Sequence, residues 1–366
     1  MKISFIEPHL KLYGGIRRII ELSNRLTKRG HDVTIFHSDG SPCEWMECIA
    51  KTKSASEVLV EEHDALIFND PSYVDYRLAQ QAIARVKIFY VLELYEMNLL
   101  RGINLKICLP KNRRTLFVKA SLQSPFIKIS NATWLVTWLK ENLNINSHLL
   151  IGGVNTEMFY FVKTKKNRDE IHILCSGDPR KRKGTSTIIK AIEIAKQKEP
   201  RIILDTYHGK DIPQYRMAEI YSSADIFVDA QWQAGWNNPV AEAMACKVPV
   251  ICTDIGGVQG IAQNKETALL VPPRDPEAMA TAILRLVQDE NLRATLVENA
   301  YQHILRFNWD RSAQQLEQIL LSELSDDVCS RTVHRYSFLN TLLINISDIL
   351  LTAKKILSKA HSRIFK

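Results

Sequence analysis

The sequence predicts an α/β protein with two domains, each a mostly parallel sheet covered by helices on both faces. Short apolar runs typical of buried strands alternate with stretches of helical spacing in the first 92 residues, and the same alternation restarts at residue 171. A polar run at 163–170, reading KTKKNRDE, separates the two halves and predicts a linker. The length of 366 residues also corresponds to about two domains.

The first half begins with a predicted strand at residues 2–7 and a tight turn at Gly14 and Gly15. A helix is expected over 16–29, because its isoleucines repeat on one face, and Gly30 ends it. Further strands are expected at 33–37, 65–69 and 86–92, with a helix at 73–84. The pattern becomes irregular over residues 100–165.

The second half repeats the strand and helix rhythm without repeating the first half by residue identity. The expected strands cover 171–176, 202–207, 225–228 and 248–253, and the expected helices cover 214–222 and 239–245 and begin at 275 and 290. Parallel strands place the loops that follow them at one edge of a sheet, where ligands bind. Functional residues are therefore sought in those loops.

Composition excludes several classes of protein. With 46% hydrophobic and 24% charged residues the chain is globular, and it has no apolar run of the ~20 residues that cross a bilayer. The first residues, MKISFIEP, do not resemble a signal peptide, so a cytoplasmic location is expected. The seven cysteines show no metal-binding spacing, which favours reduced thiols and no structural zinc.

A basic loop follows the first strand of the second half. It contains four consecutive cations, Arg180 to Lys183, which could bind a diphosphate. The alternative is a solvated basic loop. Nucleic acid is a weaker alternative, because the net charge of +8 is modest and no aromatic residues are interleaved for stacking on bases.

A polar loop at residues 234–238 leads into the helix expected from Pro239. Its amides and the side chains of Asn237 and Asn238 could hydrogen-bond a polyhydroxylated ligand. Glu242 lies near the start of that helix, where an acid is also favoured by the helix dipole without any function. Two glycine pairs, at residues 14–15 and 256–257, suit a close approach of ligand, although a plain turn explains each equally well.

Taken in order, these segments resemble the retaining glycosyltransferases of family four over about residues 1–325. The most specific stretch runs from Tyr221 to Glu277 and contains YSSADIFV, NPVAEAMAC, VPVICTDIGG and ETALLVPPRDPE. Supporting motifs are YGGIR, KRGHDV, GVNTE, the Lys183–Gly184 pair and FNW. The resemblance implies the GT-B fold, in which two Rossmann-like domains face each other across a cleft.

The resemblance also implies domain boundaries. Residues 1–165 would form the acceptor-side domain and residues 166–308 the domain that binds a nucleotide-activated sugar. A helix at 309–325 would cross back to the first domain. Residues 326–366 lie beyond the resemblance.

The roles implied by the family fall on matching positions of this chain. Lys183 would hold the diphosphate, Glu242 the ribose hydroxyls, and Gly15 would line the first-domain side. The usual arginine of the basic loop is Asp178 here, so Arg180 or Arg182 would take its place. The donor sugar and phosphate would meet the backbone of Asn237, Asn238, Pro239 and Val240. No metal and no cofactor are expected, because a sugar nucleotide is a co-substrate and no Asp-x-Asp pair is present beside the diphosphate site.

Two departures from the family pattern concern the substrates. The family glutamate eight positions before Glu242 is Ala234 here, with Gln233 beside it. The stretch after the fourth strand has a Tyr-Glu pair, as in members that assemble polysaccharides, and we expect Glu93 and Glu96 to orient the acceptor hydroxyl. The alternative for both glutamates is a solvated or ion-paired loop.

The last segment has a net charge of +4 and apolar residues at helical spacing over residues 338–366, which predicts a basic amphipathic helix. One interpretation is contact with an anionic membrane surface, where lipid-linked acceptors are found, and it would make the protein peripheral on the inner face of the membrane. The other is a helix packed on the first domain or on a second copy of the chain.

The sequence therefore predicts a metal-independent, retaining glycosyltransferase of the hexosyltransferase type. It would move a sugar from a nucleotide-diphosphate sugar to a glycan or lipid-linked acceptor in polysaccharide biosynthesis. Two alternatives remain open: a non-catalytic module that binds sugar nucleotides, suggested by Ala234 and Asp178, and a nucleotide-sugar epimerase.

Overall fold

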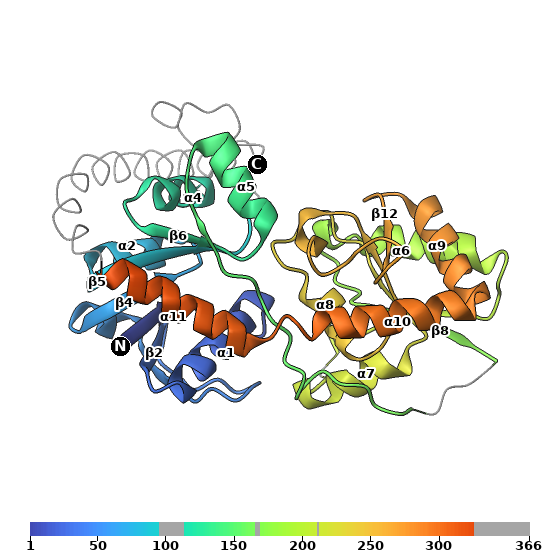
Figure 1. Cartoon of the computed structure of the whole chain (residues 1–366), viewed down its shortest axis with the longest axis horizontal. Helices are drawn as coiled ribbons and strands as arrows, with labels where there is room; N and C mark the ends of the chain where they lie inside the picture. Colours follow the sequence, from blue (N-terminus) through green and yellow to red (C-terminus); the bar gives the residue numbers. More distant parts are fainter. Residues whose placement is uncertain (95–112, 165–168, 211, 326–366) are drawn as a thin grey trace, which may run out of the picture. The chain divides into compact units, whose positions relative to one another are not determined.

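The computed structural model describes residues 1–94, 113–164, 169–210 and 212–325 (Figure 1). The chain forms two compact units, each built on one parallel sheet with helices. Unit 1 comprises the described residues of 1–130, 136–149 and from 313 onward; unit 2 comprises 131–135 and 150–312. The predicted α/β class is confirmed in both units. The main segment of unit 2 begins at residue 150, ahead of the linker expected at 163–170.

Unit 1 contains a sheet of seven strands within its described residues, and every neighbouring pair is parallel. The order across the sheet is β3-β2-β1-β4-β5-β6-β7. The strands are β1 (Lys2–Ile6), β2 (Asp32–His37), β3 (Lys51–Ser54), β4 (Glu62–Phe68), β5 (Ile83–Val91), β6 (Ile127–Ser130) and β7 (His148–Leu149).

The helices of unit 1 correct two expectations. Helix α1 (Gly14–Lys28) begins at the glycine pair, so the turn predicted there is wrong and the glycines form the first turn of the helix. The stretch expected to be irregular continues the strand and helix rhythm, with α4 (Arg113–Gln123) and α5 (Thr133–Leu143) on either side of β6. The other helices that contribute to this unit are α2 (Tyr73–Gln81) and, from residue 313, α11 (Trp309–Ser325).

Unit 2 is built on a five-stranded parallel sheet in the order β12-β11-β10-β8-β9, counted over the residues that the structure describes. Its strands are β8 (Ile171–Cys175), β9 (Ile202–Thr206), β10 (Ile226–Asp229), β11 (Val250–Thr253) and β12 (Leu269–Val271). Its helices are α6 (Thr185–Lys196), α7 (Met217–Ser223), α8 (Asn238–Ala245), α9 (Pro276–Gln288) and α10 (Glu290–Ile304).

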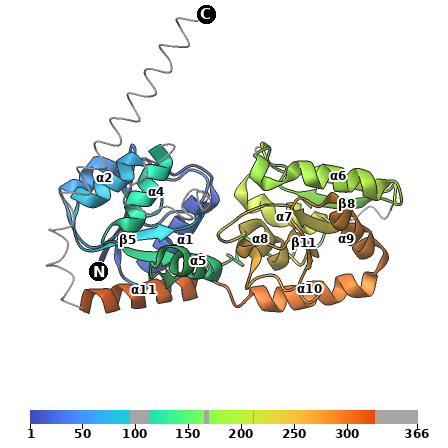
Figure 2. The ribbon, with the colours of Figure 1, turned by 90° about the horizontal axis from the view of Figure 1, so that it is seen from above.

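Helices cover both faces of the unit 2 sheet (Figure 2). Alternate strand residues point to opposite faces, and each face has its own apolar core. Ile226 and Val228 pack with residues of α6 and α9, whereas Phe227, between them in sequence, packs with residues of α7 and α8. This doubly wound arrangement buries the strands and leaves the loops after them as the place where polar groups gather.

Each sheet has one topological switch point, where successive connections leave the first strand in opposite directions. In unit 1 it lies between β1 and β4, and in unit 2 between β8 and β10. Loops that diverge at a switch point open a crevice at the carboxyl ends of the strands, which is where open α/β sheets bind ligands. The loops after β8 and β10 carry most of the site residues expected in unit 2.

Two expectations fall outside the described residues: Glu96 and the amphipathic helix over 338–366. Among the helices that the structure describes, none is both long enough and apolar enough to cross a membrane. The five cysteines of the described ranges are free thiols.

Candidate functional site

The loop after β8 carries the basic run and places Lys183 at the switch point of unit 2. A short 3-10 helix over Lys181–Lys183 ends at Gly184, which adopts the left-handed conformation with φ of 69° and starts α6. A Cβ atom on Gly184 would collide with the backbone of Ala230, directly after β10. Glycine is therefore needed for the loops after β8 and β10 to touch.

A buried polar network joins these two loops. Lys183 Nζ donates a hydrogen bond of 2.6 Å to Gln231 Oε1, and Gln231 Nε2 donates to Asp229 Oδ2 at 3.0 Å and to Asn237 Oδ1 at 3.2 Å. Asn237 Nδ2 donates to Asp229 Oδ1 at 2.9 Å. Asp229, Gln231 and Asn237 are all at least 95% buried. Since both its amide donors are used, Gln231 must turn its oxygen toward Lys183, which holds the ammonium group in place.

The same network shapes the start of α8. Asn237 is the N-cap residue, and its Oδ1 accepts a long hydrogen bond of 3.5 Å from the Val240 amide. Pro239 lies in the first turn, where its missing N–H costs nothing. The helix starts at Asn238, one residue earlier than the sequence predicts. The structure thus brings Lys183 and the start of α8 together at one switch point.

Glu242 lies on α8 with its side chain buried. Tyr221 donates a hydrogen bond of 2.8 Å to Glu242 Oε2, and the Tyr207 hydroxyl lies 3.3 Å from that of Tyr221. Burial and the nearby Glu242 raise the pKa of Tyr221 well above its usual value, so the phenol stays protonated and can donate. This contact fixes the orientation of the carboxylate that is expected to meet ribose hydroxyls.

Asp178, at the position of the family arginine, binds the neighbouring Arg180. The Arg180 guanidinium donates to both carboxylate oxygens of Asp178. Burial by itself would raise the pKa of Asp178, but the hydrogen bonds from the side chain and backbone of Arg180 outweigh it and lower the pKa to about 2. Arg182 is half-buried in the same loop, and its carbonyl accepts from the Trp232 amide at 2.9 Å.

The glycine pair after β11 is part of the same edge. The Gly257 carbonyl accepts a hydrogen bond of 3.0 Å from the Asn237 amide. A Cβ atom on Gly257 would lie 2.6 Å from that of Ala234, so the two loops touch backbone to backbone. Trp134 Nε1 donates to the Gly235 carbonyl at 3.2 Å. The loops after β10 and β11 are therefore packed against each other as well as hydrogen-bonded.

The expected site residues of unit 1 lie at the carboxyl edge of its own sheet. Gly15 is in the first turn of α1, and a Cβ atom there would lie 3.3 Å from Leu92, directly after β5. Glu93 follows Leu92 and is half-buried. The structure therefore brings Gly15 close to the segment of Glu93.

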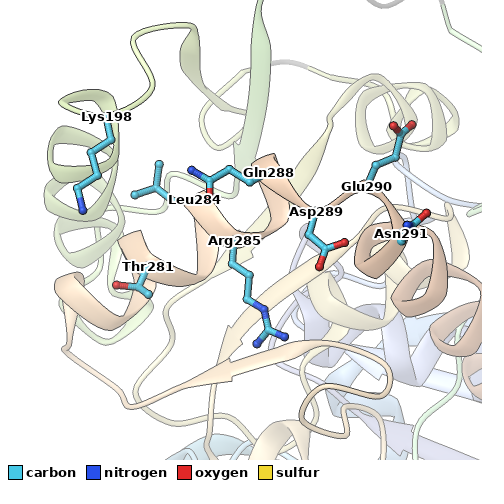
Figure 3. A pocket seen from close by; sticks show the side chains of 8 residues that line it. All are labelled: Lys198, Thr281, Leu284, Arg285, Gln288, Asp289, Glu290 and Asn291. Carbon is cyan, nitrogen blue, oxygen red and sulfur yellow. The ribbon is translucent and has the colours of Figure 1, made fainter.

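An open hollow of about 850 Å³ lies elsewhere on unit 2 (Figure 3). The side chains drawn there come from the end of α9, the start of α10 and the segment after α6. Crossover helices run opposite to the strands, so these helix ends lie at the amino edge of the sheet, away from the loops after β8 and β10. The hollow contains no expected site residue.

Three residues of the site were not expected from the sequence: Asp229, Gln231 and Tyr221. Asp229 ends the apolar run IFVD, and an acid at the end of a buried strand was an available signal. Gln231 and Tyr221 act through partners distant in sequence, which the sequence alone does not show. Among the described residues, no group of three His, Cys, Asp or Glu side chains could hold a metal ion.

Comparison with protein families identifies the segment that carries this site. Residues 156–289 match the family described as glycosyl transferases group 1. This segment is a group 1 glycosyltransferase domain. The match agrees with the family-four resemblance of the sequence, and the recognition of a family-four-like glycosyltransferase is confirmed.

Relatives of known name agree with this family. The D-inositol 3-phosphate glycosyltransferase of Corynebacterium urealyticum is 33% identical over 113 residues, which is 31% of this chain. The aligned segment spans 27% of that relative, about a quarter of its length. The sequence match is therefore to one domain of a longer enzyme.

Solved structures show the fold over most of the chain. Sucrose-phosphate synthase from Thermosynechococcus elongatus matches with a TM-score of 0.70 and 20% identity, covering 88% of this chain and 99% of that structure. Anabaena HepE in complex with UDP and glucose matches with a TM-score of 0.66 and 16% identity, covering 88% of this chain and all of that structure. These neighbours confirm the GT-B fold, in agreement with the two parallel sheets.

Proposed function

We propose that the chain is a retaining glycosyltransferase that moves a sugar from a nucleotide-diphosphate sugar to a glycan or lipid-linked acceptor without a metal ion. The observation that carries the proposal is the network of Asp229, Gln231 and Asn237, which holds the Lys183 ammonium beside the start of α8. A fixed cation beside the start of a helix at a switch point suits a diphosphate. HepE, of the same fold, was solved with UDP and glucose.

The chemistry follows from where charge develops. When the bond between the donor sugar and the diphosphate breaks, negative charge grows on the departing phosphate oxygens. Lys183 and the positive end of the α8 dipole would stabilise that charge, and they need no reorganisation because the network already holds them. Glu242, fixed by Tyr221, would accept hydrogen bonds from the ribose hydroxyls. Retention of the anomeric configuration and the roles of Gly15, Glu93 and Glu96 rest on the family resemblance.

The first test measures thermal stabilisation of the full-length protein by a panel of nucleotides and nucleotide-diphosphate sugars. A ligand that binds only the folded state raises the melting temperature in proportion to its affinity. We expect one sugar nucleotide to stabilise the wild type, and Lys183→Ala and Glu242→Ala to remove that stabilisation. Matched controls are Lys198→Ala and Glu290→Ala, exposed residues of the hollow in Figure 3, which should respond as the wild type does.

Turnover then separates the enzyme from its alternatives. Release of the nucleotide diphosphate that requires an acceptor supports transfer, and a product with the donor's anomeric configuration supports retention. Activity that persists in a metal chelator supports a reaction without a metal ion. Binding without turnover would favour a non-catalytic module, and conversion of the donor sugar without acceptor would favour an epimerase.

A further inference from the structure

Trp232, one residue beyond the buried network, lies beside cations that come from two other loops. It follows Gln231 in the loop after β10, and its amide donates to the Arg182 carbonyl at 2.9 Å. The guanidinium carbon of Arg274 lies 4.0 Å from the centroid of the Trp232 ring, and Lys181 Nζ lies 5.9 Å from the same centroid. Arg274 comes from the loop after β12 and Lys181 from the loop after β8, so this cluster lies at the carboxyl edge of the sheet.

The two cations have no acceptor among the residues that the structure describes. Lys181 and Arg274 are exposed, and neither side chain forms an ion pair or a side-chain hydrogen bond with any described residue. Asp275, beside Arg274, accepts from the Ala278 amide at 2.9 Å as the cap of α9. The nearest sequence neighbour with a carboxylate is thus already engaged in capping.

Stacking on Trp232 positions the guanidinium of Arg274 for recognition. A guanidinium that stacks on an aromatic ring uses its face and leaves its N–H edge available for two parallel hydrogen bonds to a carboxylate or phosphate. Arg274 also has a φ of 66°, a left-handed backbone that costs a side chain about 1 kcal/mol. The contact with the indole restrains the guanidinium before a ligand arrives, which lowers the entropy lost on binding.

We propose that Arg274 and Lys181, held on Trp232, form a subsite for an anionic group of a saccharide substrate, a carboxylate or a phosphate. The inference rests on the proposed function for its location, because Gln231 beside Trp232 contacts Lys183 at the diphosphate site. The subsite makes the enzyme selective for an acidic sugar over its neutral counterpart. The acidic group belongs either to the donor sugar or to the acceptor, and the two sources are distinguished by experiment.

The donor arm compares UDP-glucuronic acid with UDP-glucose, which differ only in a carboxylate. Dissociation constants are measured by calorimetry at constant ionic strength for the wild type, Arg274→Gln and Lys181→Gln. Arg285→Gln, an exposed arginine at the opposite edge of the same unit, is the matched control. We expect Arg274→Gln to lower the affinity for UDP-glucuronic acid about tenfold, which is the loss typical of one charge-assisted contact. The affinity for UDP-glucose should stay within twofold of the wild-type value.

The acceptor arm compares cellobiouronic acid with cellobiose, each titrated into protein saturated with UDP. If Arg274→Gln lowers the affinity for cellobiouronic acid about tenfold and leaves that for cellobiose unchanged, the anionic group belongs to the acceptor. If neither arm shows a loss of affinity that is selective for the acid, including the case in which both members of each pair lose affinity equally, the subsite is overturned. A wild type that binds neither UDP-sugar excludes uridine as the nucleoside of the donor, which the proposed function does not specify, and titrations of the two disaccharides without UDP then decide the subsite.

Discussion

The switch point of unit 1 holds the buried acid Glu7, and the switch point of unit 2 holds the buried acid Asp229. Each acid is hydrogen-bonded to an asparagine, Asn69 in unit 1 and Asn237 in unit 2. Asp229 accepts on both oxygens. Glu7 accepts on Oε1 only, and its Oε2 has no hydrogen-bond partner among the described residues.

A second acid sharpens this contrast. Asp75, in the first turn of α2, is buried, and its Oδ2 also lacks a partner within the described chain. Burial and then the nearby Asp75 raise the pKa of Glu7, and burial and then Asp70 raise the pKa of Asp75 to about 7. Unpartnered carboxylates in a dry site cost stability. The comparison shows that unit 2 satisfies both oxygens of the acid at its switch point, whereas Glu7 and Asp75 of unit 1 each have one oxygen without a partner among the described residues.

The largest effect is expected from breaking the loop contact in unit 2. Gly184→Ala would force a Cβ atom against the Ala230 backbone at a φ of 69°. Gly209→Ala is the matched control, because Gly209 has a φ of 72° but nothing within 4 Å of the added atom. We expect Gly209→Ala to lower the free energy of unfolding by about 1 kcal/mol, and Gly184→Ala by roughly 1–3 kcal/mol more.

Urea unfolding of both variants under the same conditions measures this difference. Gly184→Ala should also lose stabilisation by the sugar nucleotide, because Lys183 precedes it directly. Equal losses of stability in the two variants would mean that the loops after β8 and β10 do not depend on their close contact.

The next prediction concerns Asp75, one of the two buried acids of unit 1 that have an oxygen without a partner among the described residues. The pKa of Asp75 is raised to about 7 from an ordinary value near 4, so the folded state keeps a proton that the unfolded state loses. Stability of the wild type should therefore fall as the pH rises from about 4 to about 7. Asp75→Asn should be more stable than the wild type at pH 8, by on the order of 2 kcal/mol, and should show no such gain at pH 4.

An acid of the same unit that has an ion-pair partner should show the opposite effect of an Asp→Asn change on stability at high pH. The hydrogen bond from Lys51 lowers the pKa of Asp32, so that ion pair stabilises the folded state above pH 4. Asp32→Asn should therefore lower the melting temperature slightly at pH 8. Melting temperatures of both variants across pH 4–8 test the contrast, and an Asp75→Asn variant less stable than the wild type at pH 8 would contradict it.

The sequence predicts what local pattern controls and misses what distant partners control. Eight of the described strands are predicted because apolar runs mark them, whereas β6 and β12 are missed although they are largely buried. Lys183, Asn237 and Glu242 are named as candidates because they lie in motifs. Strand β3, reading KTKS, is missed because an edge strand with polar side chains has no apolar signal. Helix α1 begins earlier than expected, because glycines read as a turn can also form the first turn of a helix whose packed face follows.

The candidate site shows the same difference between residues named by local motifs and residues that act through distant partners. Lys183 and Gln231 are 48 residues apart, and nothing local in the sequence indicates that an amide will hold the ammonium group. The partner of Glu242, Tyr221, lies 21 residues before it in another helix. A candidate binding group can therefore be named from the sequence, whereas the groups that orient it depend on the order of the strands.

The smallest effect is expected from changing the acid that orients Lys183. Asp229→Asn keeps the shape of the side chain but replaces one acceptor oxygen with an NH₂ group. That group would face the amide donors of Gln231 or Asn237, so one of the two side chains must turn away. If Gln231 turns, its oxygen no longer meets Lys183, and we expect affinity for the sugar nucleotide to fall about tenfold, as for one lost charge-assisted hydrogen bond.

Asp289→Asn is the matched control for this variant. Asp289 caps α10 by accepting from the Leu292 amide at 2.8 Å, and asparagine caps helices equally well. Dissociation constants are measured well below the melting temperature of each variant, so that a loss of stability alone does not change them. A fall in affinity confined to Asp229→Asn would show that Asp229 acts on ligand binding through Lys183. Equal affinities in the two variants would show that other contacts hold Lys183. The network would then serve only the packing of the loops.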